Sequence, residues 1–211
     1  MQEFILKDVK LILLPDKAIY LPDYRTLLLA DLHLGKVNHF RRSGIPVPTQ
    51  TNDKNIDRLI ALLQEQELER VIFLGDLFHS HYNAEWEVFG QVLKSFPTIK
   101  FELVIGNHDI MSEYQYLKHE IEIIKDPLPL GPFILSHEPL EVFEGYNLAG
   151  HIHPAVKLRG KARQAMRLPC FFFGEQQGLL PAFGEFTGAH TLKPKKSDQI
   201  FVILDNQVLS V

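Results

Sequence analysis

Five short apolar runs in this chain each end in a cluster of aspartate, histidine or asparagine. The runs cover residues 27–30, 71–74, 101–105, 133–135 and 147–149, and each has the length of a buried strand. The clusters that follow them are Asp31-Leu32-His33, Gly75-Asp76-Leu77-Phe78-His79, Gly106-Asn107-His108-Asp109, Ser136-His137 and Gly150-His151-Ile152-His153. In α/β sheets, ligands bind just beyond the carboxyl ends of the strands. We therefore expect the five clusters to meet at one edge of a sheet.

The spacing of apolar residues predicts an α/β fold for the first half of the chain. We expect residues 3–29 to form a hairpin and then a strand, because two Pro-Asp pairs interrupt their apolar stretches. Apolar residues recur at helical spacing in residues 49–66 and again in residues 83–96. Helices that alternate with short, wholly apolar strands indicate parallel β/α units.

The second half is expected to be rich in strands. From about residue 120 the helical spacing fades, and strand-like runs follow at 121–124, 133–135, 156–158, 168–173, 178–183 and 199–204. We predict that these runs form a second sheet. Because the chain contains no linker, repeat or low-complexity tract, we expect a single α/β domain over residues 1–211. In it, two sheets pack together and the helices lie outside them.

The side chains in the five clusters are suited to binding metal ions. They offer carboxylate and amide oxygens and imidazole nitrogens but no thiolate, a donor set that suits divalent Mn, Fe, Ni, Zn or Co. About seven candidate ligands are too many for one tetrahedral ion and suit two. A pair of metals about 3.5–4 Å apart can clamp an in-line displacement at phosphorus and lower the pKa of a bound water. Two carboxylates against two dications leave the site positive, which favours a phosphate anion.

Each cluster also has a purely structural explanation when it is taken alone. An isolated Asp-x-His or Gly-Asp is usually a turn, and His137 alone would more often be a hydrogen-bonded core residue than a ligand. These explanations would all have to apply at once, each directly after an apolar strand. The joint pattern therefore favours the metal site.

The ordered set of DLH at 31–33, GD at 75–76, GNHD at 106–109, His137 and GHIH at 150–153 resembles the calcineurin-like metallophosphoesterase superfamily. The resemblance implies a four-layer α/β/β/α sandwich of two mixed sheets and a phosphoester hydrolase with two divalent metals, Mn²⁺ first among them. It assigns one metal to Asp31, His33, Asp76 and His153. It assigns the other metal to Asp76 as a bridge, Asn107, His137 and His151.

The same resemblance gives His108 a catalytic role. It implies that His108 lies near the scissile phosphate and stabilises charge or protonates the leaving oxygen. One position departs from the family pattern: many members read Gly-Asp-x-x-Asp, and the second aspartate commonly orients this histidine, whereas this chain has His79 there. His79 and Asp109 are therefore the two candidate partners of His108.

Longer sequence segments restrict the resemblance to one subgroup of the superfamily. DLHLGKVNHFRRSGIPVP at 31–48, GDLFHS at 75–80, LPCFFFG and LLPAFGEFTG look like the bacterial PdeM-type, ligase-associated DNA damage response phosphoesterases. That group implies a DNA phosphodiesterase or endonuclease that is functionally associated with DNA ligase and helicase repair proteins. Lys36, Arg41 and Arg42 follow the first motif and are candidates for holding phosphate at the mouth of the site. A solvated helix or loop face explains these three cations nearly as well.

Charge leaves the substrate open. The net charge of −4 argues against a general nucleic-acid coat, but a basic stretch with no acid falls within eleven residues, and its cations are Lys157, Arg159, Lys161, Arg163 and Arg167. A second basic group comprises Lys193, Lys195 and Lys196. A solvated hairpin and a loop explain both groups at least as well as DNA binding does.

Two other functions remain alternatives to a DNA enzyme. The first is a phosphoesterase that acts on nucleotides or other small phosphomonoesters. The second is a catalytically inactive scaffold, which is disfavoured because every expected ligand and His108 are present.

The sequence indicates a cytoplasmic protein. A single cysteine, Cys170, excludes an internal disulfide and fits a reducing compartment. The N-terminus MQEFILKDVK lacks the pattern of a signal peptide. No apolar run approaches the roughly 20 residues needed to span a bilayer, so no membrane association is expected.

Overall fold

The computed structural model describes residues 1–35, 50–79, 82–159, 165–185 and 187–211, and for residues 50–53 and 159 it describes the backbone alone. Its first half forms a seven-stranded mixed sheet in which the strands are ordered as in the sequence. The first four strands are antiparallel neighbours and the last four are parallel. The strands are β1 (Gln2–Leu6), β2 (Val9–Leu14), β3 (Ala18–Leu21), β4 (Thr26–Leu29), β5 (Arg70–Leu74), β6 (Lys100–Val104) and β7 (Ile121–Ile124). A 3-10 turn, η1 (Pro22–Tyr24), joins β3 to β4.

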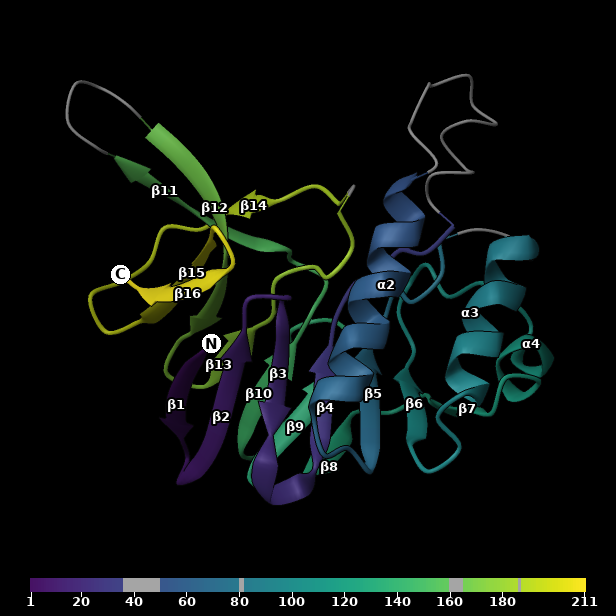
Figure 1. Ribbon diagram of the computed structural model, residues 1–211. Helices are drawn as coiled ribbons and strands as arrows, with labels where there is room; N and C mark the ends of the chain where they lie inside the picture. The colour runs from purple at the N-terminus through teal and green to yellow at the C-terminus, as the bar shows by residue number, and fades with distance from the viewer. Residues whose placement is uncertain (36–49, 80–81, 160–164, 186) are drawn as a thin grey trace.

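The second half forms a nine-stranded mixed sheet. At its centre β10 pairs in parallel with both β9 and β13, whereas β12 pairs antiparallel with β11, β13 and β15. The strands are β8 (Leu128–Leu130), β9 (Phe133–Ser136), β10 (Tyr146–Ala149), β11 (Pro154–Arg159), β12 (Ala165–Phe173), β13 (Gln177–Leu179), β14 (His190–Thr191), β15 (Gln199–Leu204) and β16 (Gln207–Ser210). The β11 and β12 strands extend from the body of the sheet as a projecting hairpin (Figure 1).

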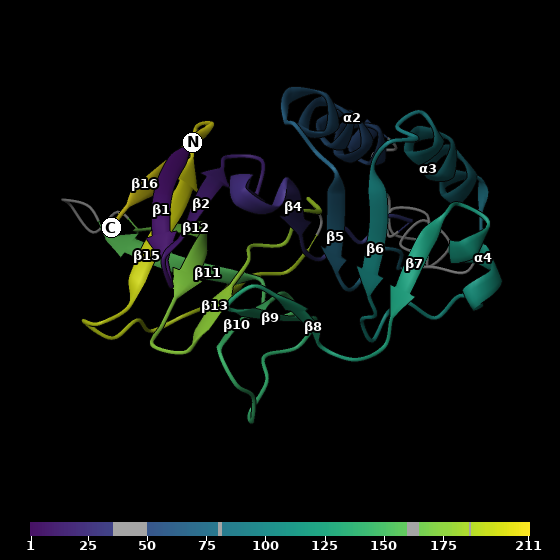
Figure 2. The same cartoon turned by 90° about the horizontal axis from the view of Figure 1, so that it is seen from below.

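Among the residues that the structure describes, three α-helices accompany the first sheet. They are α2 (Gln50–Glu65), α3 (Ala84–Lys94) and the short α4 (Glu113–Leu117). The helix α3 begins where the Asn83 side chain accepts hydrogen bonds from the backbone N–H groups of Glu85 and Trp86 in the first turn. Viewed from below, α2 and α3 lie on the face of the first sheet that is turned away from β8–β10 (Figure 2). After Leu117, the described residues form strands, turns and loops but no helix.

Successive residues of the central strands enter two different cores. Leu27 and Leu29 of β4 pack with the helices, whereas Leu28 and the following Ala30 pack with the second sheet. All four are fully buried, because side chains alternate across a strand and both faces of this sheet are covered. This double burial explains why β4 and β5 read as uninterrupted apolar runs.

Two mixed sheets with helices confirm the predicted fold class, and the structure corrects several details. The run 121–124 was expected in the second sheet, but it pairs in parallel with β6 of the first. The run 178–183 was expected to be one strand, but β13 ends at Leu179. Pro181 lacks the N–H group that a continuing ladder needs. The helix α4 and the strands β8, β14 and β16 had no clear periodic signal, because each has five residues or fewer.

Candidate metal centre

The five polar clusters meet at one edge, where the two sheets come together. Three clusters follow β4, β5 and β6 of the first sheet, and two follow β9 and β10 of the second. Backbone hydrogen bonds continue past the strand ends and hold the clusters in register. The N–H of Asp31 donates to the carbonyl of Gly75 (3.2 Å), and the N–H of Gly150 donates to the carbonyl of His137 (3.0 Å). The expected convergence of the clusters is therefore present.

One group of possible ligands consists of Asp31, His33 and His153, whose ligand atoms all lie within 4.8 Å of one another. The Nδ1–H of His153 donates to the carbonyl of Gly188 (3.0 Å), which leaves Nε2 as the lone-pair nitrogen of the neutral ring. That Nε2 lies 3.2 Å from Oδ1 of Asp31. Within the described part of the chain, neither atom has a hydrogen-bond partner. Two buried acceptors that face each other in this way fit a cation between them.

A second group consists of Asp76, His137 and His151, again with all ligand atoms within 4.8 Å. The Nδ1–H of His137 donates to the carbonyl of Leu74 (3.0 Å), so its Nε2 carries the lone pair. This Nε2 lies 3.0 Å from Oδ1 of Asn107 and 3.5 Å from Oδ1 of Asp76. Here too, acceptor atoms converge on one point, and they include the predicted Asn107.

Asp76 lies between the two groups. Its Oδ2 is 3.6 Å from Nε2 of His33, and its Oδ1 is 3.5 Å from Nε2 of His137. The side chain is almost fully buried. Each oxygen thus faces an imidazole nitrogen of a different group, and Asp76 could contribute a ligand atom to both. All seven residues that the sequence nominated as ligands lie at this centre.

The backbone at the centre is strained. The residues Asp31, His33, Asp76, His151 and His153 all have a φ between 46° and 63°. This left-handed region is uncommon for residues other than glycine, and each instance costs about 1–3 kcal/mol unless the surroundings enforce it. Five of the six residues in the two groups share it, so the loops are bent sharply at the positions that carry ligand atoms.

Two glycines allow the loops to approach one another closely. Gly75 has a φ of +74°, and a Cβ there would lie 2.2 Å from Nδ1 of His137. A Cβ at Gly150 would lie 2.7 Å from Oδ2 of Asp31. Any larger residue at either position would push a ligand side chain out of place.

In the structure, Asp109 contacts backbone amides, whereas the sequence suggested it as a partner of His108. Asp109 was a candidate partner of His108, but its buried carboxylate accepts hydrogen bonds from the backbone N–H groups of Asp76, Leu77, Phe78 and Gly106, at 2.8–3.3 Å. Burial raises the pKa of Asp109 to about 6, against the opposing effect of these amides. Asp109 therefore holds the Gly-Asp loop against the Asn-His-Asp loop.

His79 lies beside His108, as the other sequence-based candidate for its partner. The two rings are tilted at 36° with their centroids 3.9 Å apart. Nδ1 of His79 is also 3.1 Å from Nδ1 of His33. The backbone N–H of His108 donates to Oδ1 of Asp76 (2.9 Å), which ties the histidine to the centre. His79 therefore connects a possible metal ligand to the expected catalytic histidine.

Residues 24–183 match the family model described as calcineurin-like phosphoesterase. This chain belongs to the calcineurin-like phosphoesterase family. As a family member that carries two candidate metal-binding groups, it is a metal-dependent phosphoester hydrolase.

Solved structures extend the comparison beyond the family model. The chain is similar over its full length to the Pseudomonas putida nuclease MPE, with 34% identity, 99% of that chain covered and a TM-score of 0.83. It also matches a protein of unknown function, AQ665 from Aquifex aeolicus, with 19% identity over 61% of this chain and 78% of the other, at a TM-score of 0.42. No curated protein matches the chain. The full-length likeness to the nuclease agrees with the phosphoesterase fold.

Several predicted residues of this phosphoesterase lie outside the described ranges. Lys36, Arg41 and Arg42, proposed to hold phosphate, fall in residues 36–49, and Lys161 and Arg163 fall in residues 160–164. Conversely, the carbonyl of Gly188 was not foreseen as part of the site. It orients His153 from 35 residues away, and a backbone carbonyl carries no signal in the sequence. Within the described ranges, no helix has the length and apolar character needed to cross a membrane.

Proposed function

We propose that this protein is a dinuclear phosphodiesterase that cleaves DNA. The observation that carries the proposal is the full-length likeness to a nuclease together with two ligand groups that have Asp76 between them. When bound, two divalent metals would lower the pKa of an attacking water and neutralise charge on the phosphate. Mn²⁺ is our first candidate, and Fe, Ni, Zn and Co suit the same nitrogen and oxygen donors.

The residues of the chain then divide the remaining work. Asp31, His33 and His153 would hold one metal, and Asn107, His137 and His151 the other, with Asp76 between them. His108 would meet the phosphate from outside these groups and either stabilise its charge or give a proton to the leaving oxygen. His79, whose ring lies against that of His108, would fix the ring's orientation.

The basic stretch of residues 157–167 supports DNA as the substrate. Lys157 of β11 lies directly opposite Arg167 of β12, and both side chains are exposed. Like charges placed opposite each other in a ladder destabilise it, so an anionic partner such as a nucleic-acid backbone would relieve a cost that the hairpin otherwise bears.

A substrate panel tests the proposal. Protein stripped of metal and reloaded with Mn²⁺ is assayed on single- and double-stranded DNA, cyclic nucleotides, bis-p-nitrophenyl phosphate and p-nitrophenyl phosphate. We expect turnover of DNA and of the simple diester. Turnover of nucleotides or monoesters alone would identify a small-molecule phosphoesterase, and a protein that binds no metal and turns over nothing would be a scaffold.

A charge-reversal variant tests the contribution of the basic stretch. Replacing Arg159, Lys161 and Arg163 with Glu should weaken DNA cleavage and spare bis-p-nitrophenyl phosphate, because only DNA is long enough to reach the hairpin. Lys193, Lys195 and Lys196 provide a matched control with the same change in charge. Equal losses on both substrates would count against DNA binding by the stretch.

From the resemblance to the PdeM-type phosphoesterases, we propose that the protein works in the cytoplasm in association with DNA ligase and helicase repair proteins. Cys170, its single cysteine, is free and buried, which accords with a reducing compartment. Co-purification of a tagged protein with a ligase or helicase from DNA-damaged cells would test this association.

A further inference from the structure

A cavity of about 190 Å³ adjoins the metal centre and shares His153 with it. Its walls come from the turn between β2 and β3, from the base of the β11–β12 hairpin and from residues 182–185 and 187–189. The polar side chains that line it, besides His153, are those of Lys17, Arg167, Glu185 and Thr187. A group held in this cavity would therefore sit next to whatever the metal centre holds.

The part of this wall formed by residues 182–185 is hydrogen-bonded to the end of β4, next to Asp31. The backbone N–H of Phe183 donates to the carbonyl of Ala30 (2.8 Å), and that of Gly184 donates to the carbonyl of Asp31 (3.0 Å). The guanidinium of Arg58 on α2 lies 4.0 Å from the centre of the Phe183 ring and also donates to the Phe183 carbonyl. Cavity and metal centre are thus parts of one rigid arrangement.

The charges that line the cavity favour an anion. Lys17 and Arg167 are cations, and Glu185 is the one acid among the described lining residues. Glu185 also forms an ion pair with Arg58, because its Oε1 lies 3.6 Å from Nη1 of that residue. Burial and then the positive charge of Arg58 lower the pKa of Lys17 to about 8, in spite of Glu185. Among the described lining residues, the two cations thus outnumber the single acid.

The size of the cavity favours part of a substrate over a whole small molecule. Pockets for drug-sized ligands have volumes of roughly 300–1,000 Å³, and one water needs roughly 10–15 Å³. At about 190 Å³, this cavity has room for one compact anionic group with its water. Outside the cavity, the row of cations extends from Arg167 to Lys157, which lies opposite it on the neighbouring strand of the hairpin.

We propose that this cavity binds the phosphate next to the scissile phosphate of a nucleic-acid strand, with Lys17 and Arg167 as its ligands. The inference rests on the proposed phosphodiesterase function and adds a specificity site to it. The strand would run from the metal centre past Lys17 to Arg167 and on to Lys157. A diester without a neighbouring phosphate would lack this contact.

The test compares substrates that differ by one phosphate. A thymidine dinucleotide is assayed without a terminal phosphate, with one at the 5′ end and with one at the 3′ end, and cleavage of the internal diester is followed by chromatography. We expect one terminal phosphate to raise kcat/KM about tenfold, a factor that corresponds to 1.4 kcal/mol. Lys17→Met and Arg167→Gln should each bring that ratio towards one.

The matched controls are Lys10→Met and Arg25→Gln. Both residues are partly or fully exposed cations in ion pairs, and Arg25 precedes β4, whereas the metal centre follows it. They should leave the ratio at the wild-type value. Lys17 and Arg167 lie on different elements. If one variant fails to fold, the other still tests the phosphate site.

A binding measurement is independent of turnover. In EDTA, the affinity for a fluorescent single-stranded oligonucleotide falls with salt, and the slope of log K against log salt should shrink by about 0.7 for each lost phosphate contact. If the terminal phosphate does not raise kcat/KM in the wild type, or if neither variant changes the ratio of kcat/KM with and without it, the phosphate site is overturned. The proposed phosphodiesterase function would then still stand. Failure to cleave any nucleotide diester while bis-p-nitrophenyl phosphate turns over overturns the proposed function as well.

Discussion

Asp109 illustrates how a single buried carboxylate can position a catalytic site without touching substrate. It sits in the Asn-His-Asp loop and accepts four backbone N–H groups, three of them from the neighbouring Gly-Asp loop. These amides follow the ends of β5 and β6, and within the described ranges no turn or loop hydrogen bond joins them to a backbone carbonyl. The carboxylate therefore satisfies the turns that aim Asp76 and His108 at the centre.

Replacing Asp109 with Asn should damage stability and metal binding together. The amide NH₂ would face backbone donors in place of an acceptor, and a buried donor left unsatisfied costs about 1–3 kcal/mol. We expect a loss of that size in the free energy of unfolding, measured with urea, and weaker Mn²⁺ binding by calorimetry. If Asp109 instead acted through His108, the variant would keep its stability and its metal and lose only rate.

We expect His108 to play the opposite role, with a side chain that serves the reaction and not the binding of the metals. His108→Ala should lower kcat by about 10²- to 10⁴-fold, the range for a positioned acid or base. Metal analysis should still find the wild-type content, since the contact of His108 with Asp76 is made by its backbone N–H. Loss of metal in this variant would place His108 among the ligands.

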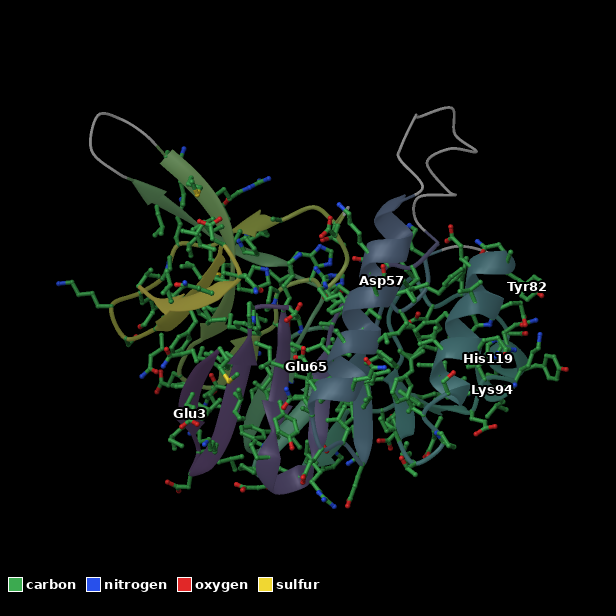
Figure 3. All side chains as sticks on the ribbon, in the orientation of Figure 1. Glu3, Asp57, Glu65, Tyr82, Lys94 and His119 are labelled. Carbon is green, nitrogen blue, oxygen red and sulfur yellow. The ribbon has the colours of Figure 1, made fainter. Side chains whose placement is uncertain are left out.

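Among the elements, α3 is packed too closely against its neighbour for the usual helix rules to hold. Gly90 lies in the middle of α3, where alanine would normally stabilise a helix by about 1 kcal/mol. A Cβ at Gly90, however, would lie 2.1 Å from Nδ1 of His119. His119 is buried beside α3 near Lys94 (Figure 3), and its ring packs edge-on against Trp86.

Gly90→Ala should therefore destabilise the protein by about 1–2 kcal/mol, because overpacking a core costs about 1–3 kcal/mol and outweighs the helical gain. In a His119→Ala background, the same change should stabilise α3. Urea denaturation of the wild type, both single variants and the double variant forms a cycle that measures the coupling. The same loss in both backgrounds would exclude the contact with His119 as its cause.

A buried ion cluster joins β5 to β6 and makes their pairing sensitive to acid. The Glu102 side chain is only 2% exposed, and it accepts hydrogen bonds from Arg70 and from Lys100. Burial by itself would raise the pKa of Glu102, but these two cations outweigh it and hold the pKa below the ordinary 4.5. The folded state thus favours the charged carboxylate more than the unfolded chain does.

The contribution of Glu102 to stability should be fully present above pH 4.5 and disappear as the pH falls through its lower, folded-state pKa. Unfolding free energies of the wild type and Glu102→Gln should therefore differ most near neutrality and converge as the pH falls below 4.5. Lys10→Met, which breaks the exposed pair with Glu3, serves as a control and should change little. A difference independent of pH would show that the charge on Glu102 is not what matters.

At the scale of the whole molecule, the metal centre links the two sheets. Each ligand group draws residues from both: Asp31 and His33 meet His153, and Asp76 meets His137 and His151. The strained backbone at five of these positions is a cost that the folded chain bears with or without metal. Bound metal should therefore stabilise the junction between the sheets.

Addition of Mn²⁺ should raise the unfolding midpoint of the stripped protein. A ligand at a hundred times its Kd stabilises a fold by about 2.7 kcal/mol per site, provided that the unfolded chain does not bind it. Asp76→Ala should abolish this response and empty both sites, since the two oxygens of that carboxylate face one group each. A midpoint unaffected by Mn²⁺, or two metals retained in Asp76→Ala, would contradict the shared centre.

The sequence by itself determined the parts of the centre and the sheet edge that carries them. The apolar runs at residues 71–74 and 101–105 predicted buried strands, and the polar clusters after them predicted metal ligands. Both predictions were possible because the periodicity of apolar residues and the chemistry of side chains are local properties of the sequence. Even the order of the five clusters along the chain was readable, and it was enough to indicate the family.

Only the tertiary structure decided how those parts are combined. It turned Nε2 of His153 towards Asp31 through the distant Gly188 carbonyl, and it engaged Asp109 with backbone amides in place of His108. It also placed Lys17 beside His153 in one cavity. These outcomes depend on which loops of two separate sheets are brought together, and long-range packing, unlike periodicity, leaves no mark in any short stretch of sequence.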